Sequence, residues 1–385
     1  MTDSPLFFTT LPVAQDFGWG ICGRNLLREL GHLGRVSFIY DRYCVERSSN
    51  AIEDLWIRST LATPEEQALY QTPHNHLTLV AVTEFGDLAA SPGGGKNIVG
   101  IAFNLKIFDD GIPRLRDQFA YIAAGSEWCK DLFLKNGINA VSAPQGIDQA
   151  LFHSGFAEKI LPDDRFLIYS GGKFEFRKGQ DYVIRAVQHM QQKYRDVWLV
   201  AQWFNQWLFS YNGMSLSDKI IFNPAISLSN QEFSQEMSKI FADNGIDQNR
   251  VILAPNTPQT LAPILIRETD VGIFPNRIEG GTNLMLMEYM ACGKPAIATA
   301  HTGHLDVVAD EWALCLKNNS PVHVTENHPP GFDSWYESDL DELIAHLEWA
   351  YNNRDAARRL GLRSATEMKK FTWKNCADRI VTGPR

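Results

Sequence analysis

The feature that most constrains the fold is an alternation of short apolar runs with amphipathic stretches, which occurs twice along the chain. In the first half, β-rich runs at 36–40, 98–103 and 121–125 alternate with helical patterns. The alternation restarts at 166–170, and a helical pattern over 180–194 follows. Such alternation predicts parallel sheets with helices on both faces. A chain of 385 residues with this restart predicts two α/β domains in tandem.

Charge and cysteine content narrow the class of protein. The formal net charge of −9 argues against a protein that coats nucleic acid through basic contacts to phosphates. The six cysteines include no C-x-x-C pair, so we expect neither a zinc site nor a redox motif, and free thiols indicate a reducing cytosol. There is no run of about 18 apolar residues, and the N-terminal stretch lacks the basic region of a secretory signal. We therefore expect a cytoplasmic protein.

A glycine-rich run near the N-terminus is the first candidate binding element. Residues 18–23 formally match the G-x-G-x-x-G dinucleotide fingerprint, and Asp41 follows at the end of a strand pattern. The preceding strand pattern ends near Pro12, however, so the first glycine is not tight against the strand. This spacing disfavours a nucleotide-dependent dehydrogenase. A longer glycine loop at a helix start still offers backbone N–H groups to an anion; the alternative is a turn that needs positive φ.

A basic turn follows the first strand of the second half. Residues 170–179 join that strand to a helical pattern, and Lys173, Arg177 and Lys178 lie within six residues of one another. The turn is not a Walker loop, because Lys173 is not followed by Ser or Thr. Open α/β domains bind ligands at the carboxyl ends of their strands, so three cations there suit a diphosphate. The alternative is a solvated basic turn.

The segment 275–295 is the most informative one. A strand pattern ends just before it, and a Glu-Gly-Gly-Thr-Asn turn then precedes an apolar helical pattern over 282–291. Backbone N–H groups at a helix N-terminus can bind a phosphate, and carboxylates accept hydrogen bonds from the diols of a sugar or ribose. Together these features predict a nucleotide-sugar site; the alternative is a capping acid and a surface acid. The candidate residues are Glu279, Gly280, Gly281, Thr282, Asn283, Leu284 and Glu288.

Short motifs distributed over most of the chain together resemble retaining glycosyltransferase family 4. Besides the glycine loop and the paired glutamates, they include S-E-W from Ser126, P-Q-G-I-D from Pro144 with Phe152, G-K…K-G from Gly172 to Gly179, and M-A-C-G-K-P from Met290. Each motif alone is weak, and taken jointly they are specific.

The resemblance implies the GT-B fold, an α/β architecture of two Rossmann-like, doubly wound domains that face an interdomain cleft. Residues 1–155 would form the acceptor-binding domain, 156–365 the nucleotide-sugar-binding domain, and 366–385 a C-terminal helix that packs back toward the first domain. The implied activity is retaining, metal-independent transfer of a sugar from a UDP- or GDP-linked donor to a hydroxyl of a glycan, a lipid or a small molecule. No resident cofactor, metal or nucleic acid is expected.

The resemblance also implies roles for individual residues. Lys173 and Lys178, with the amides of the glycine turn, would neutralise the diphosphate, Glu279 would bind the transferred sugar, and Glu288 would bind the ribose hydroxyls. Lys178, Glu279 and Lys173 are therefore the expected catalytic groups. The other expected donor-binding residues are Gly18, Gly20, Arg177, Gly280, Gly281, Thr282, Asn283, Leu284 and Glu288.

Two departures from the family pattern bear on the site. Eight residues separate Glu279 from Glu288, where seven are most common, and the extra residue falls in the glycine turn. Asn104 stands nearest to the position where the family often has a His or a Glu. Because the usual His or Glu is absent, a catalytically silent partner subunit remains an alternative. A sugar-nucleotide epimerase, which would share the fold and cleft, is another. The D-x-D match from Asp339 to Asp341 opens a helical pattern, so we interpret it as capping acids.

Three further expectations concern the remaining segments. Ser126 is expected to cap a helix that runs to about Lys135, and the tail from about 355 to 380 is expected to be helical with a break at Gly361. The insertion 203–235 is dense in aromatic residues at its start, which can stack on sugars or anchor a contact with a second copy; the alternative is a local core. A peripheral contact with the inner face of a membrane would suit a lipid acceptor.

Overall fold

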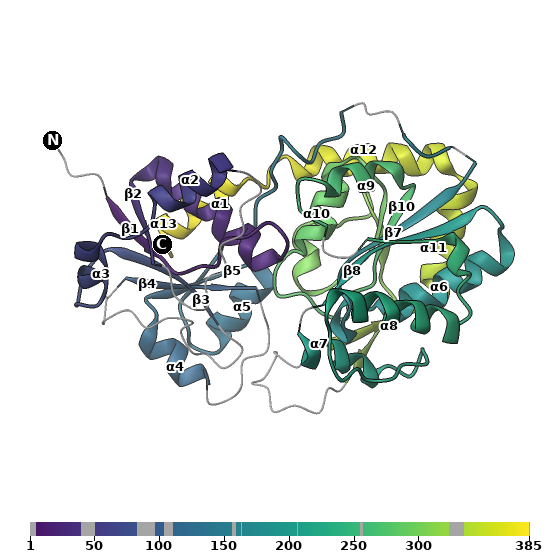
Figure 1. The fold of residues 1–385 in the computed structure, drawn as a ribbon, viewed down its shortest axis with the longest axis horizontal. Coiled ribbons are helices and arrows are strands. Elements are labelled where there is room, and N and C mark those ends of the chain that lie inside the picture. The colour runs from purple at the N-terminus through teal and green to yellow at the C-terminus, as the bar shows by residue number, and fades with distance from the viewer. Residues whose placement is uncertain are drawn as a thin grey trace.

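The computed structural model describes residues 5–39, 51–82, 97–103, 111–155, 159–162, 164–205, 207–254, 257–322 and 335–384. Within these ranges the chain forms two α/β domains that lie side by side, each built around a six-stranded sheet (Figure 1). The two-domain α/β fold expected from the alternating pattern is thus confirmed. Among the described residues, no helix is both long and apolar enough to cross a membrane.

The N-terminal domain is a parallel sheet in the order β2-β1-β3-β4-β5-β6. Its strands are nearly all buried, because helices cover both faces and leave mainly apolar side chains between the layers. The strands are β1 (Leu6–Thr9), β2 (Arg35–Phe38), β3 (Leu77–Ala81), β4 (Ile98–Ala102), β5 (Tyr121–Ala124) and β6 (Ala140–Ser142). The helices are α1 (Gly18–Leu33), α2 (Ala51–Ser59), α3 (Pro64–Tyr70), α4 (Gly111–Gln118) and α5 (Glu127–Lys135).

The C-terminal domain repeats the design with a parallel sheet in the order β12-β11-β10-β7-β8-β9. Its strands are β7 (Phe166–Lys173), β8 (Val197–Phe204), β9 (Val251–Leu253), β10 (Val271–Phe274), β11 (Ala296–Thr299) and β12 (Leu314–Leu316), with a small antiparallel pair, β13 (Asn319–Val322) and β14 (Trp335–Ser338). The helices are α6 (Gln180–Lys193), α7 (Leu208–Asn212), α8 (Asn230–Asp243), α9 (Ala262–Glu268), α10 (Leu284–Ala291), α11 (Leu340–Asn352) and α12 (Arg354–Met368). Short 3-10 turns are η1 (Phe176–Lys178), η2 (Gly213–Leu216), η3 (Gln248–Arg250) and η4 (Thr302–Asp306).

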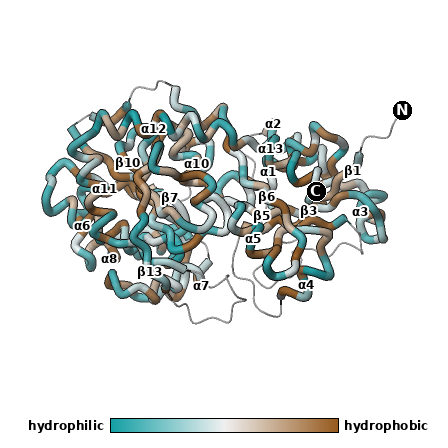
Figure 2. Tube along the Cα trace, turned by 180° about the vertical axis from the view of Figure 1, so that it is seen from behind, coloured by the Kyte–Doolittle hydropathy of each residue, from teal (hydrophilic) through white to brown (hydrophobic). Residues whose placement is uncertain are grey.

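The outer helices are amphipathic. Along α6, α11 and α12 the trace alternates between hydrophilic and hydrophobic positions (Figure 2). In α11, for example, Leu343, Leu347 and Ala350 are buried, and this spacing of three to four residues places them on one face of the helix. Burial of such faces against the two sheets is the main source of stability of both domains.

The chain ends in the domain in which it began. The last helix, α13 (Trp373–Thr382), packs against α1 and contributes Trp373, Cys376 and Ile380 to the core of the N-terminal domain. Arg379 anchors it by donating from Nη1 to the carbonyl oxygen of Ser142 at 3.2 Å. The chain therefore crosses between the domains twice, once after β6 and once between α12 and α13 (Figure 1).

The expected break at Gly361 is wrong, because α12 continues through this residue to Met368. Gly361 lies where α12 crosses the turn after α10, and a side chain there would overlap the carbonyl oxygen of Gly293. The glycine thus permits a close helix crossing and does not end the helix. The break falls instead at 369–372, where the chain passes to the N-terminal domain.

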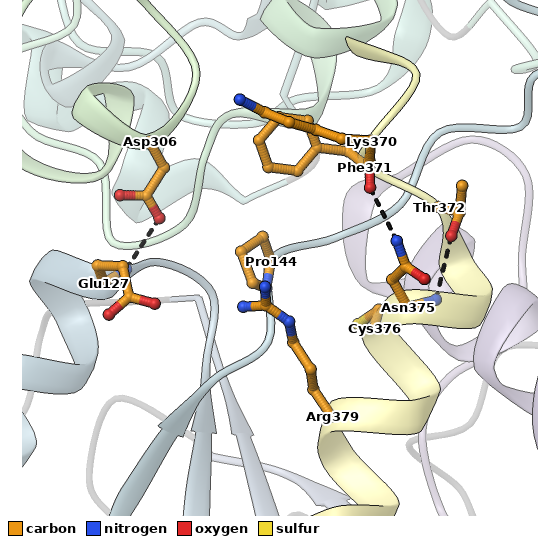
Figure 3. Close-up of a pocket in the computed structure, with 9 residues that line it drawn as sticks. All are labelled: Glu127, Pro144, Asp306, Lys370, Phe371, Thr372, Asn375, Cys376 and Arg379. Carbon is orange, nitrogen blue, oxygen red and sulfur yellow. Dashed lines mark hydrogen bonds between the residues drawn. The ribbon is translucent and has the colours of Figure 1, made fainter. Parts of the chain in front are cut away.

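The N-terminus of α5 joins the two domains next to the glycine turn. Ser126 caps the helix as expected, accepting from the amide of Cys129 at 3.1 Å, and also donates to the carbonyl oxygen of Gly280 at 2.7 Å. The amide of Glu127 donates to Asp306 of η4 at 2.9 Å (Figure 3). A cavity of about 420 Å³ lies beside this contact, between the two domains. The glycine turn is therefore held by residues of both domains.

Candidate functional site

The carboxyl ends of the C-terminal strands face the N-terminal domain across a cavity of about 360 Å³. Loops that follow β7, β8, β9 and β10 line one side of it, and the start of α1 lines the other. Ligands of doubly wound sheets bind at this edge. The polar and charged residues that line it include Gln15, Lys173, Arg177, Lys178, Gln202, Gln259, Glu279, Asn283 and Glu288.

Glu279 is the centre of a buried charged cluster. Its carboxylate accepts hydrogen bonds from Lys178 Nζ and, at 2.5 Å, from Asn276, and forms an ion pair with Arg177 at 3.0 Å. Burial alone would raise the pKa of Glu279, but the charges of Arg177 and Lys178 lower it to about 2. Glu279 is therefore ionised at neutral pH, and the basic turn and the glutamate segment meet at this point.

A second acid, Glu175, shares the same cations. It pairs with Arg177 at 2.6 Å and with Lys173 at 3.5 Å, and although burial opposes ionisation, these cations hold its pKa well below the usual range. Burial lowers the pKa of Lys178, while Glu279 acts in the opposite direction. Three cations thus face two carboxylates, which leaves one positive charge in the cluster to attract an anion.

The glycine turn follows Glu279 in the chain and lines the same cavity through Gly281 and Asn283. Asn283 adopts a left-handed conformation with φ of 61° and precedes α10 without a side-chain cap. This conformation delays the start of α10 to Leu284, so the helix begins two residues later than the expected Thr282. Gly281, Asn283 and Leu284 line the cavity, and the uncapped first amides of α10 make this end of the cavity suitable for a phosphate group.

Glu288 lies in the same cavity, but its side-chain partner is an amide and not a cation. Its carboxyl group is buried and accepts a hydrogen bond from Gln259 Nε2 at 2.5 Å. Burial, with a small contribution from the charge of Asp148, raises the pKa of Glu288 to about 8. Glu288 is therefore mostly protonated at neutral pH, and can both donate to and accept from a hydroxyl group.

The N-terminal glycine loop divides into two roles. Gly18 opens α1 and lines the cavity, whereas Gly20 is buried against the backbone of Ala14, which a side chain there would overlap. Gly280 and Thr282 also lie outside the residues that line the cavity; Gly280 bonds to Ser126, and Thr282 donates to the sulfur of Met287. The other expected site residues, from Lys173 to Glu288, line the cavity together.

Aromatic side chains close the cavity on both sides. Trp19 packs against Phe103, with ring centres 5.1 Å apart, on the N-terminal side. Trp207, from the loop after β8, lies 6.4 Å from Phe17 across the cleft, and Lys173 Nζ lies 4.8 Å from its ring centre. Trp207 therefore connects the basic turn to the N-terminal domain.

Much of the rest of the insertion packs into the C-terminal domain. Trp203, Tyr211 and Met214 are buried in the main core of the C-terminal domain. Phe209 and Ile226, by contrast, are 64% and 96% exposed. The buried part of 203–235 thus belongs to the main core of the domain and not to a separate local core.

Several site residues were not singled out from the sequence. The side chain of Gln259 donates a hydrogen bond to Glu288. Its backbone N–H donates to the carbonyl oxygen of Gln15 at 3.0 Å, and this bond joins the two domains. Asn276 binds Glu279, and Gln202 accepts from the hydroxyl of Tyr169 at 2.7 Å. All three follow or end a parallel strand, so a rule that considers every polar residue at strand carboxyl ends would have found them.

Two expectations outside the cavity have different outcomes. Asp339 caps α11 as expected, accepting from the amides of Asp341 at 2.8 Å and Glu342 at 3.1 Å. Asn104, the residue nearest to the usual His or Glu, lies outside the described residues.

Comparisons with known proteins agree with this geometry. Residues 155–327 match the family model of group 1 glycosyl transferases. An uncharacterized glycosyltransferase of Methanocaldococcus jannaschii is 30% identical over 112 residues, a match that spans 29% of this chain and 26% of the relative.

Solved structures resemble the whole chain. A sucrose-phosphate synthase of Thermosynechococcus elongatus has a TM-score of 0.65, and Anabaena HepE, solved with UDP and glucose, has a TM-score of 0.64. Each is 14% identical to this chain, and each match covers 98% of both chains. The chain therefore has the GT-B fold, and its resemblance to the glycosyltransferases is confirmed, with the family's sequence pattern located in residues 155–327.

Proposed function

We propose that this protein is a retaining glycosyltransferase that moves a sugar from a nucleoside diphosphate sugar to an acceptor hydroxyl. The observation that carries the proposal is the meeting, in one interdomain cavity, of a cationic cluster, uncapped helix amides and two chemically distinct glutamates. HepE, which shares the fold, was solved with UDP-glucose, and this supports a UDP-linked donor.

The diphosphate would lie between the basic turn and the first turn of α10. Lys173 and Lys178 come from one side and the amides near Asn283 from the other, so both can donate to the phosphate oxygens. Negative charge on the diphosphate grows as its bond to the sugar breaks. Fixed positive groups then stabilise the transition state more than the bound donor, which is the requirement for catalysis.

The two glutamates would bind the two polyhydroxyl parts of the donor. Glu279, which is ionised and directly precedes the glycine turn, would accept hydrogen bonds from hydroxyls of the transferred sugar. Glu288, held by Gln259, can donate and accept hydrogen bonds, so it would bind the two hydroxyls of the ribose. With the leaving phosphate as the nearest base for the acceptor hydroxyl, the sugar would be transferred on the same face, with retention and without a metal.

A panel of UDP-, GDP- and ADP-sugars in thermal-shift measurements tests donor binding. Ligand at about 100 times its dissociation constant stabilises the folded state by about 2.7 kcal/mol, which is easily measured. We expect one nucleotide class to raise the melting temperature, and Lys178→Ala to reduce that shift. Absence of a shift with every nucleotide would contradict the proposal.

Product analysis tests the reaction itself. The purified chain should hydrolyse or transfer the sugar of the donor it binds, and nuclear magnetic resonance of the product should show the anomeric configuration of the donor. Binding without turnover would indicate a silent partner subunit. A free nucleotide sugar with altered stereochemistry would indicate an epimerase.

A further inference from the structure

A second large cavity lies on the C-terminal domain, away from the interdomain cleft. It has a volume of about 820 Å³ and is formed where the interdomain linker, the turn between α9 and β10, and α12 meet. We call it the linker pocket. The described charged residues that line it are Lys159, Arg267, Asp270, Lys294, Arg354 and Arg358.

Basic groups outnumber acidic groups at the linker pocket by five to one, in a protein whose net charge is −9. The one acid is already occupied: Asp270 accepts from Lys159 Nζ at 3.0 Å and from the amide of Leu167 at 2.8 Å. Arg354 pairs with Asp196 at 3.1 Å. Arg267, Lys294 and Arg358 therefore supply the excess positive charge.

Lys294 carries a charge that no carboxylate contacts within the described parts of the chain. Its half-buried ammonium group donates to the carbonyl oxygens of Arg267 at 2.6 Å and Thr269 at 2.8 Å. An ammonium group has three hydrogens, so one remains for a ligand. Burial, and next the charge of Lys159, lower the pKa of Lys294 to about 8. An anion in the pocket would oppose both effects, because its negative charge stabilises the charged form of Lys294.

The two arginines are also incompletely paired. Arg267 donates from Nη2 to the carbonyl oxygen of Leu151 at 3.2 Å, and its buried Nε has no acceptor among the described residues. Among the described residues, Arg358 is 65% exposed and forms one long ion pair, 3.4 Å, with the more exposed Asp355. A pair of this kind contributes little, so the guanidinium group of Arg358 is free to turn toward a ligand.

We propose that the linker pocket binds the phosphate group of a soluble phosphorylated small molecule. Arginine and lysine side chains converging on one cavity are the usual partners of phosphate, because their N–H groups match its oxygens in charge and geometry. The volume admits a ligand larger than phosphate itself. The site is separate from the donor cavity, and its occupancy does not depend on the proposed transferase activity.

A ligand in the linker pocket would contact both segments that connect the two domains. Lys159 belongs to the linker after β6, and Arg354 and Arg358 belong to α12, which leads to α13. These are the two segments through which the chain passes between the domains. A ligand that contacts both would fix them relative to each other.

Calorimetric titration of the whole chain with inorganic phosphate and with pyrophosphate tests the proposal. We expect Arg358→Gln to raise the dissociation constant about tenfold or more, the usual effect of losing a charge-assisted hydrogen bond, and Arg358→Lys to restore part of the affinity. Lys374→Gln is the matched control, because it removes one positive charge from an exposed position on α13. Its dissociation constant should equal that of the wild type, whereas Lys178→Ala, which removes a cation of the donor cavity, identifies any part of the binding that occurs there.

Three results would overturn the proposal. The first is no binding of either anion by the folded wild type at millimolar concentration. The second is a dissociation constant that responds to Lys178→Ala and not to Arg358→Gln, since the anion would then occupy the donor cavity. The third is binding of phosphatidylglycerol vesicles, lost in Arg358→Gln, without binding of free phosphate, which would identify a membrane surface. Because Arg358 is exposed, matching melting curves should verify that its variants fold.

Discussion

The two ends of the interdomain cavity differ in charge although one short segment of chain supplies both. At one end Glu279 is ionised, with a pKa of about 2 set by Arg177 and Lys178 against the effect of burial. At the other end Glu288 is equally buried, has an amide as its partner, and has a pKa of about 8. Residue type therefore does not decide the charge state here; the neighbours do. The charged end suits stabilisation of a leaving diphosphate, and the neutral end suits binding of hydroxyls.

The largest expected effect comes from removing a cation at the charged end. Lys178→Ala should lower kcat by about 100-fold or more, because a group that stabilises growing charge acts mainly in the transition state. Steady-state kinetics with the donor found in the thermal-shift panel measures it. A kcat/KM within a few-fold of wild type would mean that the basic turn is only a surface loop.

At the neutral end the expected effect is smaller and appears in binding. Glu288→Ala should raise the donor KM by about 10-fold, with a lesser change in kcat, because ribose hydroxyls do not change during the reaction. Dissociation constants for the nucleotide sugar and for the free nucleoside diphosphate should rise together. If only the nucleotide sugar binds more weakly, Glu288 contacts the sugar, and the roles of the two glutamates are reversed.

The contrast in charge state also predicts a pH dependence of stability. The pKa of Glu288 is higher in the folded chain, about 8, than its ordinary value of 4.5. Its contribution is therefore complete below pH 4.5 and is lost as the pH rises toward 8, because the folded state then binds more protons than the unfolded one. As the pH rises between these values, the free energy of unfolding of the wild type, measured with urea, should fall relative to that of Glu288→Gln. The difference should change by up to about 1.4 kcal/mol per pH unit. Equal slopes for the two proteins would mean that Glu288 is already ionised in the folded state.

The smallest expected effect is that of chelation. If Lys173 and Lys178 take the place of a divalent ion at the diphosphate, activity should remain unchanged in EDTA. An activity lost in EDTA and restored by Mn²⁺ or Mg²⁺ would contradict the role assigned to the charged end.

The comparison of the two ends also indicates what a sequence can reveal. Features that depend on neighbouring residues were predicted correctly. The caps at Ser126 and Asp339, for example, depend on hydrogen bonds from backbone amides two or three residues away. The parallel sheets followed from the periodicity of apolar residues. The segment holding Glu279 and Glu288 was recognised because its glycine turn and helix are contiguous in the chain.

Long-range partners could not be read in the same way. The bond from Gln259 to Glu288 spans 29 residues, and the ion pair of Lys178 with Glu279 spans 101. Ionisation of either glutamate depends on these partners and on burial, neither of which a linear pattern contains. The prediction of a helix break at Gly361 was wrong for the same reason, because the role of this glycine depends on its contact with Gly293, which is distant in the chain.

The position of α13 has a consequence for the order in which the chain folds during synthesis. The core of the N-terminal domain includes Trp373, Cys376 and Ile380, which the ribosome synthesises after the whole C-terminal domain. The domain made first can therefore bury its full apolar surface only after the other domain has been synthesised, reversing the usual order in which N-terminal domains complete folding first. Until then the face of α1 that packs against α13 stays open to water, so a stalled or truncated chain would expose an apolar surface that chaperones and proteases recognise.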